Sequence, residues 1–214
     1  MNELLATALD DRDEAWEIQF FKLLPEVHFT FLSDSPIEGP DGMPYLAVEI
    51  SEDGEPASKV LDWLGEKGVG LAVNPKKETP DYVFSYGMIW NYLLNGEFLT
   101  ASESDSEKRG GQEFEVTPGQ EMMAGTPSEA YFPPHVRKVF KEFLGQQGVH
   151  QPRVVMLSQD SKNYDLCFSL ESLGNPPQEE WQGVLEAFSW FFPLHYSFSI
   201  ISEDSIQGID FVEI

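Results

Sequence analysis

The stretch MMAGTPSEAYFPPHVRKVFKEFLGQQGVHQPRVVMLSQDSKNYDLCFSLE, residues 122–171, decides the fold class of this 214-residue chain. Its middle predicts a helix, because apolar residues recur at helical spacing from Val136 to Leu144, after two prolines and before two glycines. The apolar run at 153–157 predicts a central strand. Apolar and polar residues then alternate over 164–171, which predicts a strand with one buried face. Together with a short apolar strand at its start, the stretch reads as one strand, one helix and a hairpin.

The rest of the second half is also predicted to consist of helices and strands. Apolar residues at helical spacing from Trp181 to Phe192 predict a second helix that Pro193 ends. The residues 196–201 and 209–212 are predicted to be the last two strands. The second half is therefore predicted to be a β-α-β-β-α-β-β unit.

The first half shows the same mixture of elements. Residues 3–24 predict two short helices, or one helix interrupted by the acidic run Asp10–Glu14. Further helices are predicted around Val60–Leu64 and over 85–94, and strands at 27–32, 45–50, 68–73 and 82–84. The predicted fold class is α+β, with two small mixed domains, each a mostly antiparallel sheet with helices packed on one side.

A polar segment separates the two halves. Residues 100–115 contain few apolar side chains and a glycine pair, which is typical of a linker. We expect a first domain at 1–100, an acidic linker at 101–116 and a second domain at 117–214.

Charge is the strongest feature of the composition. Thirteen Lys and Arg against 37 Asp and Glu give a formal net charge of −24. Such a chain repels phosphate backbones and anionic lipid, so neither nucleic acid nor a membrane is an expected partner. The acidic surface either serves solubility or docks a basic partner protein. One cysteine, an acidic rather than basic start and no long apolar run favour a cytoplasmic location.

No motif for catalysis or for a cofactor stands out. The sequence has no GxSxG, P-loop or GxGxxG motif, and no histidine has metal-ligand spacing to another His, Cys or carboxylate. A triad assembled from distant residues stays open, but we expect no catalytic residue, cofactor or metal. Cys167 is expected to be inert, because carboxylates on its own strand face disfavour its thiolate.

Two groups of residues are the candidates for partner binding. Tyr82, Tyr86 and Trp90 come from the most aromatic segment of the chain, and such side chains lead binding hot spots, although they also fill cores. The second group consists of Arg137, Lys138 and Lys141, a local basic cluster that either contacts an anion or acidic partner or balances neighbouring acids.

Four places in the sequence carry a resemblance to a known family. They are Leu4–Asp11 with Phe20, Phe21 and Leu24; Phe31 with Leu46–Gly54 and Pro56; Gly125–Glu129 with Met156 and Leu157; and Gly208–Val212. These patterns resemble the SseB family, the enhanced serine sensitivity proteins that also carry a type III secretion label. The chain departs from the family in a longer segment at 75–116 and in its acidity. The resemblance implies an N-terminal and a C-terminal α+β domain and brings no catalytic residue or cofactor.

Three functional hypotheses follow. The first is a non-catalytic protein that acts by protein–protein interaction, as an accessory or regulatory subunit. The second is an acidic immunity or inhibitor protein that neutralises a basic toxin or nuclease. The third is an enzyme that uses a cleft between the two halves.

Overall fold

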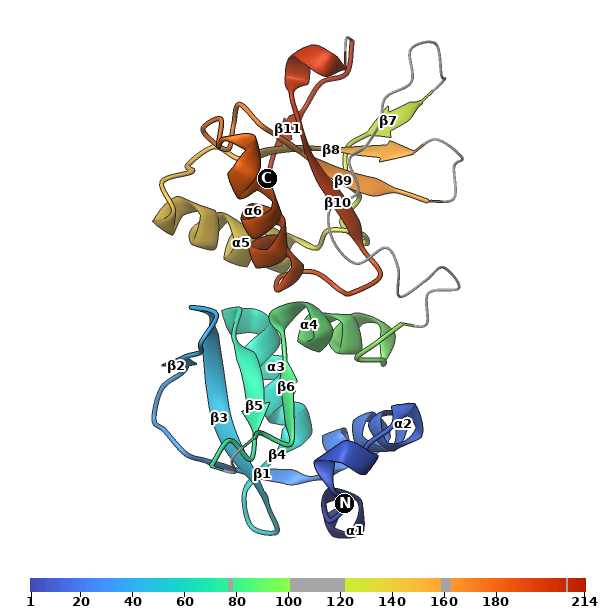
Figure 1. The fold of residues 1–214 in the computed structure, drawn as a ribbon, viewed down its shortest axis with the longest axis vertical. Helices are drawn as coiled ribbons and strands as arrows, with labels where there is room; N and C mark the ends of the chain where they lie inside the picture. The colour runs from blue at the N-terminus through green and yellow to red at the C-terminus, as the bar shows by residue number, and fades with distance from the viewer. Residues whose placement is uncertain (77–78, 101–121, 159–162, 207) are drawn as a thin grey trace. The chain divides into compact units, whose positions relative to one another are not determined.

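The structure is a computed structural model that describes residues 1–76, 79–100, 122–158, 163–206 and 208–214 (Figure 1). The chain has an α+β fold, and its contacts divide it into two compact units, Met1–Thr100 and Ala101–Ile214. The segment predicted to be a linker, 101–116, lies outside the described residues.

The first unit contains a six-stranded sheet in the described residues, in the order β4-β1-β3-β5-β6, with β2 beside β3. Only the β3–β5 pair is parallel, so the sheet is mostly antiparallel, as predicted. The elements are α1 (Asn2–Leu5), η1 (Leu9–Asp11), α2 (Glu14–Leu23), η2 (Leu24–Glu26), β1 (His28–Phe31), β2 (Ile37–Glu38), β3 (Pro44–Ser51), β4 (Glu55–Pro56), α3 (Ala57–Lys67), β5 (Gly70–Val73), β6 (Tyr82–Phe84) and α4 (Tyr86–Asn95).

Local signals in the sequence set the ends of these helices. The side chain of Asp13 accepts a hydrogen bond from the backbone N–H of Trp16 and caps α2, and Ser85 caps α4 in the same way. Gly68 and Gly96 follow α3 and α4 at φ of 70° and 79°, a left-handed conformation that glycine adopts at low cost. The apolar faces of α2, α3 and α4 then pack on one face of the sheet, against alternate strand residues such as Val48.

The second unit contains a five-stranded sheet in the described residues, in the order β10-β9-β8-β11, with β7 also paired to β8. Only the β9–β10 pair is parallel, and α6 connects these two strands. The elements are β7 (Met123–Gly125), α5 (Pro134–Gln146), β8 (Arg153–Ser158), β9 (Asp165–Ser169), α6 (Gln178–Ser189), β10 (Ser197–Ile201), η3 (Glu203–Ser205) and β11 (Val212–Glu213).

Figure 1 shows α5 and α6 on one face of this sheet, and an aromatic core joins the two helices to it. The ring of Phe140 on α5 lies 4.9 Å from that of Phe188 on α6 and 5.6 Å from that of Phe168 on β9, measured between centroids. The Phe140–Phe188 pair is edge-to-face, an arrangement that adds to the hydrophobic free energy of burial. The second half was predicted to run β-α-β-β-α-β-β, and the structure confirms this order.

The prediction that β9 has one buried face is wrong. Cys167 and Ser169 are buried as well as Leu166 and Phe168. A second apolar cluster lies on the other face, where Cys167 packs with side chains of β8, β10 and the C-terminal segment. Its members are Val155, Leu157, Cys167, Ile201 and Ile206, with Met122, Ile209 and Phe211 packed against them. The C-terminal segment thus packs against the face that alternation alone assigned to solvent.

Three smaller differences concern the ends of elements. The predicted loop at 33–44 includes β2, which is too short to leave a periodic signal. The predicted last strand at 209–212 is reduced to β11, because Ile209 and Phe211 pack in the second cluster. The helix predicted to reach Phe192 ends at Ser189.

Candidate functional site

A buried ion pair anchors the N-terminal segment of the first unit. The guanidinium of Arg12 lies 2.7 Å from Asp81 Oδ1, and it also donates hydrogen bonds to the carbonyl oxygens of Asp81 and Thr7. Arg12 precedes α2, and Asp81 immediately precedes β6. This contact therefore attaches the residues before α2 to an edge strand of the sheet.

A polar network fixes the carboxylate of this pair. The side-chain amide of Asn74 donates to Asp81 Oδ2 at 2.6 Å, and Asn74 Oδ1 accepts from the backbone N–H of Ile50 at 3.0 Å. Asn74 has φ of 51°, a left-handed conformation that asparagine adopts more readily than most residues. Asp81 thus has hydrogen-bond partners on both carboxylate oxygens, as a buried charge requires.

Aromatic side chains surround the ion pair. The Arg12 guanidinium lies over the Trp16 ring, 4.4 Å from its centroid, and the Trp16 indole N–H donates to the Leu4 carbonyl oxygen. The hydroxyl of Tyr82 donates to Glu17 Oε1 at 2.5 Å. These contacts give Trp16 and Tyr82 fixed positions between α2 and the edge of the sheet.

A hollow of about 440 Å³ opens at this place, and we call it the acidic hollow. It is lined by Leu9, Arg12, Asp13, Glu14, Trp16, Glu17, Asp81 and Tyr82. Because Arg12 is neutralised by Asp81, the carboxylates of Asp13, Glu14 and Glu17 leave the lining negative. Leu9 and Ile18 are exposed on the elements that form it, with Ile18 61% exposed. Negative charge beside aromatic and aliphatic surface suits a lysine or arginine side chain of a partner.

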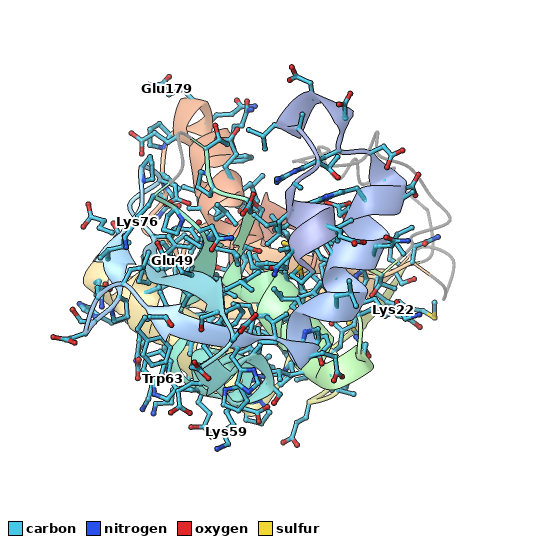
Figure 2. The ribbon with its side chains drawn as sticks, turned by 90° about the horizontal axis from the view of Figure 1, so that it is seen from below. Lys22, Glu49, Lys59, Trp63, Lys76 and Glu179 are labelled. Carbon is cyan, nitrogen blue, oxygen red and sulfur yellow. The ribbon has the colours of Figure 1, made fainter. Side chains whose placement is uncertain are left out.

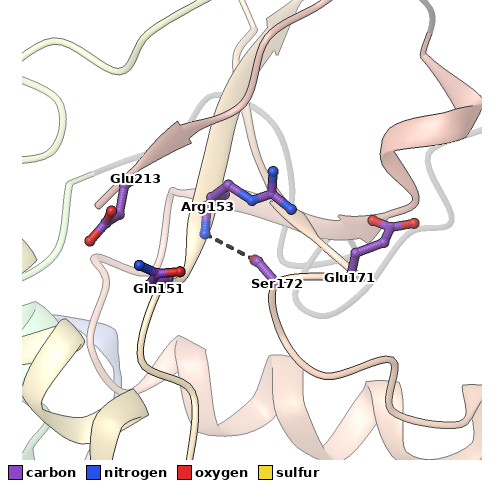
Figure 3. Close-up of a pocket in the computed structure, with 5 residues that line it drawn as sticks. All are labelled: Gln151, Arg153, Glu171, Ser172 and Glu213. Atoms are coloured by element: carbon purple, nitrogen blue, oxygen red, sulfur yellow. Dashed lines mark hydrogen bonds between the residues drawn. The ribbon is translucent and has the colours of Figure 1, made fainter.

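A second pocket, of about 500 Å³, lies in the other unit. It is lined by Gln151, Arg153, Glu171, Ser172 and Glu213 (Figure 3). Since β9 and β10 are parallel, their carboxyl ends meet at one edge of the sheet, where antiparallel β8 begins. The backbone N–H of Arg153 donates to Ser172 Oγ at 2.9 Å there, and Figure 3 shows this bond.

The charged groups of this second pocket already bind residues outside its lining. Arg153 forms an ion pair of 2.7 Å with Glu203, and Glu171 accepts hydrogen bonds from the Ser202 hydroxyl and the Glu203 backbone N–H. Burial raises the pKa of Glu171, but these hydrogen bonds lower it by more, so its pKa lies below the ordinary value. The network joins the ends of three strands, which makes it a structural element and the weaker candidate for a binding site.

The aromatic candidates from the sequence fall in different surroundings. Tyr82 lines the acidic hollow, next to Glu17. Tyr86 and Trp90 are buried, and the Tyr86 hydroxyl donates to the Gly65 carbonyl oxygen at 2.9 Å. Burial leaves these two rings little exposed surface, and their role in partner binding stays a prediction.

The basic candidates are all engaged within the second unit. Arg137 donates to the carbonyl oxygens of Phe132 and Pro127 and stacks on the Phe132 ring, which attaches the preceding loop to α5. Lys138 lies 4.0 Å from Glu142 one turn along the helix, and Lys141 pairs with Glu213 of β11. The two lysines thus balance neighbouring acids, which was the alternative interpretation.

Cys167 is buried, and the cause of its expected inertness differs from the predicted one. Burial is the largest effect on its thiol and raises the pKa to about 12; a hydrogen bond from Ser199 lowers it and the charge of Asp165 raises it. Nearby carboxylates are therefore the smaller part of the cause. Within the described ranges, no three His, Cys, Asp or Glu side chains are placed to hold a metal ion.

The sequence interpretation missed most of the acidic hollow. The run Asp10–Glu14 predicted only an interruption between helices, and Arg12 within it was not singled out. A lone arginine among four acids is a signal for a buried ion pair, because an exposed acidic run needs no cation. Its partner Asp81 lies 69 residues away, and no local pattern marks it.

Fold and site together define a two-unit α+β protein with an acidic, aromatic-lined hollow in its first unit. A comparison of the chain with known protein families, with curated proteins and with solved structures found no match. In the parts of the chain that the structure describes, no helix combines the length and apolar character needed to cross a lipid bilayer.

Proposed function

We propose that this chain is a non-catalytic cytoplasmic accessory or regulatory protein that binds a basic partner protein through its acidic surface. The acidic hollow is the proposed point of contact. The observation that carries the proposal is the negative lining of this hollow around Trp16 and Tyr82, in a chain with a net charge of −24.

The ion pairs leave most of the acidic side chains that the structure describes without a cation. Among the described residues, the cations that pair with carboxylates do so one to one: Arg12 with Asp81, Lys76 with Glu49, Lys138 with Glu142, Lys141 with Glu213 and Arg153 with Glu203. Most of the remaining described carboxylates, such as Glu14 and Glu179, are exposed. Such a surface attracts a basic partner and increases its rate of encounter.

The hollow offers specific side-chain contacts, which long-range electrostatic attraction alone does not provide. Trp16, largely buried beneath Arg12, and the half-buried Tyr82 are held by hydrogen bonds, so a partner need not order them on binding. An arginine or lysine side chain inserted there would pair with Glu14 or Glu17 and lay its aliphatic stem on Leu9. Aromatic residues beside charge complementarity are common at the centres of protein interfaces.

The net negative charge of the chain also fits one particular kind of acidic binding protein. In an immunity or inhibitor protein the basic partner would be a toxin or nuclease whose active site the acidic surface covers. The resemblance to the SseB family fits the broader proposal, since it implies two α+β domains and no catalytic residue. The identity of a captured partner separates these cases.

A capture experiment from native cell lysate tests the proposal. The full chain should retain a protein with a basic surface, and a Glu14→Lys bait should lose it. Glu179→Lys is the matched control, because Glu179 is also an exposed acid in the first turn of a helix but belongs to the second unit. Equal capture by both variants, or capture of an acidic protein only, would count against the hollow as the contact.

A further inference from the structure

The outer face of α3 carries a stripe of two lysines and a tryptophan. Lys59, Trp63 and Lys67 are spaced four residues apart, so they lie along one face of the helix. All three are exposed, and Figure 2 shows Lys59 and Trp63 at the surface of the first unit. With a rise of 1.5 Å per residue, the backbone positions of the two lysines are about 12 Å apart.

The lysines of this stripe differ from most cations of the chain. Every other described lysine or arginine except Lys22 pairs with a carboxylate or, for Arg137, with carbonyl oxygens. Lys59 and Lys67 have no ion pair or hydrogen bond with any described residue, although acids outnumber cations almost threefold. Two cations without a partner among the described residues, one helical turn to either side of the same tryptophan, are therefore unusual in this chain.

Trp63 is the tryptophan with the most exposed side chain. Its exposed fraction is 41%, whereas the other four tryptophans are buried or half-buried. Leaving so large an apolar surface in water forgoes hydrophobic free energy that a contact would recover. Tryptophan is also the residue type most enriched among interface hot spots.

We propose that this stripe binds an acidic, extended segment of another protein. In an extended strand, residues i, i+2 and i+4 point to the same side, and i and i+4 are about 13 Å apart. An acidic residue at i would pair with Lys59, an apolar residue at i+2 would cover Trp63, and an acidic residue at i+4 would pair with Lys67. The stripe thus selects the pattern acidic-x-apolar-x-acidic.

The acids around the stripe favour a narrow ligand. Asp62 and Glu66 are exposed on the adjacent face of the same helix. A broad anionic surface, such as a membrane or a nucleic acid duplex, would meet them together with the lysines, whereas one strand laid along the stripe avoids them. At physiological salt the Debye length is about 8 Å, so contacts at the stripe outweigh the distant negative charge of the chain.

The test uses indole N–H signals in two-dimensional NMR of the full ¹⁵N-labelled chain. Loss of one signal in Trp63→Phe assigns Trp63, and the remaining spectrum shows that the variant is folded. The probe is a synthetic peptide containing Glu-Ser-Leu-Ser-Glu, and the control peptide carries Lys in place of Glu. We expect the acidic probe to shift the Trp63 signal, with saturation at or below about 1 mM, and the basic peptide to leave it unchanged.

Charge-reversal variants locate the contact. The double variant Lys59→Glu/Lys67→Glu should weaken binding of the acidic probe at least about tenfold. Lys22→Glu is the matched control, since Lys22 likewise has no ion pair with a described residue but lies on α2, and it should leave binding unchanged (Figure 2). This inference does not depend on the proposed function, so Glu14→Lys should also leave probe binding unchanged.

Several results would overturn the inference. An acidic probe that leaves the Trp63 signal in place would do so, as would a shift that persists in the double variant. A tighter response to phosphatidylglycerol vesicles or to a single-stranded oligonucleotide would point to another class of ligand. A shift that depends on protein concentration without peptide would point to a second copy of this chain.

Discussion

Arg12 and Asp81, 69 residues apart in sequence, form an ion pair whose N–O distance is 2.7 Å and whose side chains are 9% and 1% exposed. The pair attaches the N-terminal segment to the sheet and neutralises the one cation that lines the acidic hollow. A buried pair need not add net stability compared with apolar residues, but removing one partner leaves an uncompensated buried charge. The position of the hollow and the stability of the first unit therefore depend on the same two residues.

Loss of either partner should destabilise the first unit. We expect Arg12→Met to lower the free energy of unfolding by about 3–5 kcal/mol, because Asp81 would remain buried without its cation. Urea unfolding checks this, with amide NMR signals of α3 reporting on the first unit. Lys76→Met is the control within the same unit: its exposed pair with Glu49 should contribute less than about 1 kcal/mol. If both variants lose the same small amount of unfolding free energy, the buried pair does not anchor the N-terminal segment to the sheet.

The hydrogen bonds to Glu171 should make stability depend on pH. Its folded-state pKa lies below the ordinary value, so the stabilisation is present above the unfolded-state pKa and is lost as pH falls through the folded one. We expect Glu171→Gln to cost no more than about 1 kcal/mol at pH 7, because solvent screens this accessible carboxylate. Unfolding measured from pH 7 down to pH 3 should show this difference shrinking toward the acid end. If the difference in unfolding free energy between the variant and the unchanged protein is constant over this pH range, the hydrogen bonds to Glu171 do not make stability depend on pH.

Cys167 should react with a thiol reagent only when the second unit opens. The thiol is buried and its pKa is raised to about 12, so the folded protein has almost no accessible thiolate at neutral pH. Labelling rates measured with increasing urea should follow the unfolded fraction. Rapid, stoichiometric labelling of the folded protein would show that Cys167 is accessible. We also expect a Cys167→Ser variant to retain partner binding.

The second half of the chain should fold alone. Its described residues form a sheet with an aromatic core on one face and the Cys167 cluster on the other. A fragment of residues 117–214 has enough apolar side chains for an independent core. We expect cooperative thermal unfolding and dispersed amide signals. An aggregating or molten fragment would show instead that the halves share one core.

The sequence predicted those parts of the fold that local patterns encode. The stripe from Val136 to Leu144 is a helix in the structure, with Val136, Phe140 and Leu144 buried. Alternation in β9 was misleading, because whether Cys167 is buried depends on a C-terminal segment about forty residues further on. The two-residue strand β2 is too short for any periodic signal.

The candidate site was less predictable than the fold. Tyr82 was identified by its aromatic surroundings, but Tyr86 and Trp90 share those surroundings and are buried. A composition signal does not tell which side of a helix faces the core. The Arg12–Asp81 pair depends on a long-range contact, so the hollow appears only when the chain is folded.

The most direct test of the central claim is the rate at which a captured partner associates with the full chain at different salt concentrations. If the acidic surface steers a basic partner, the association rate constant should fall at least about tenfold between about 10 mM and 150 mM salt. Glu14→Lys should lower the low-salt rate more than Glu179→Lys does. A rate that is flat with salt, and equal in the two variants, would contradict the proposed function and leave the charge a role in solubility alone.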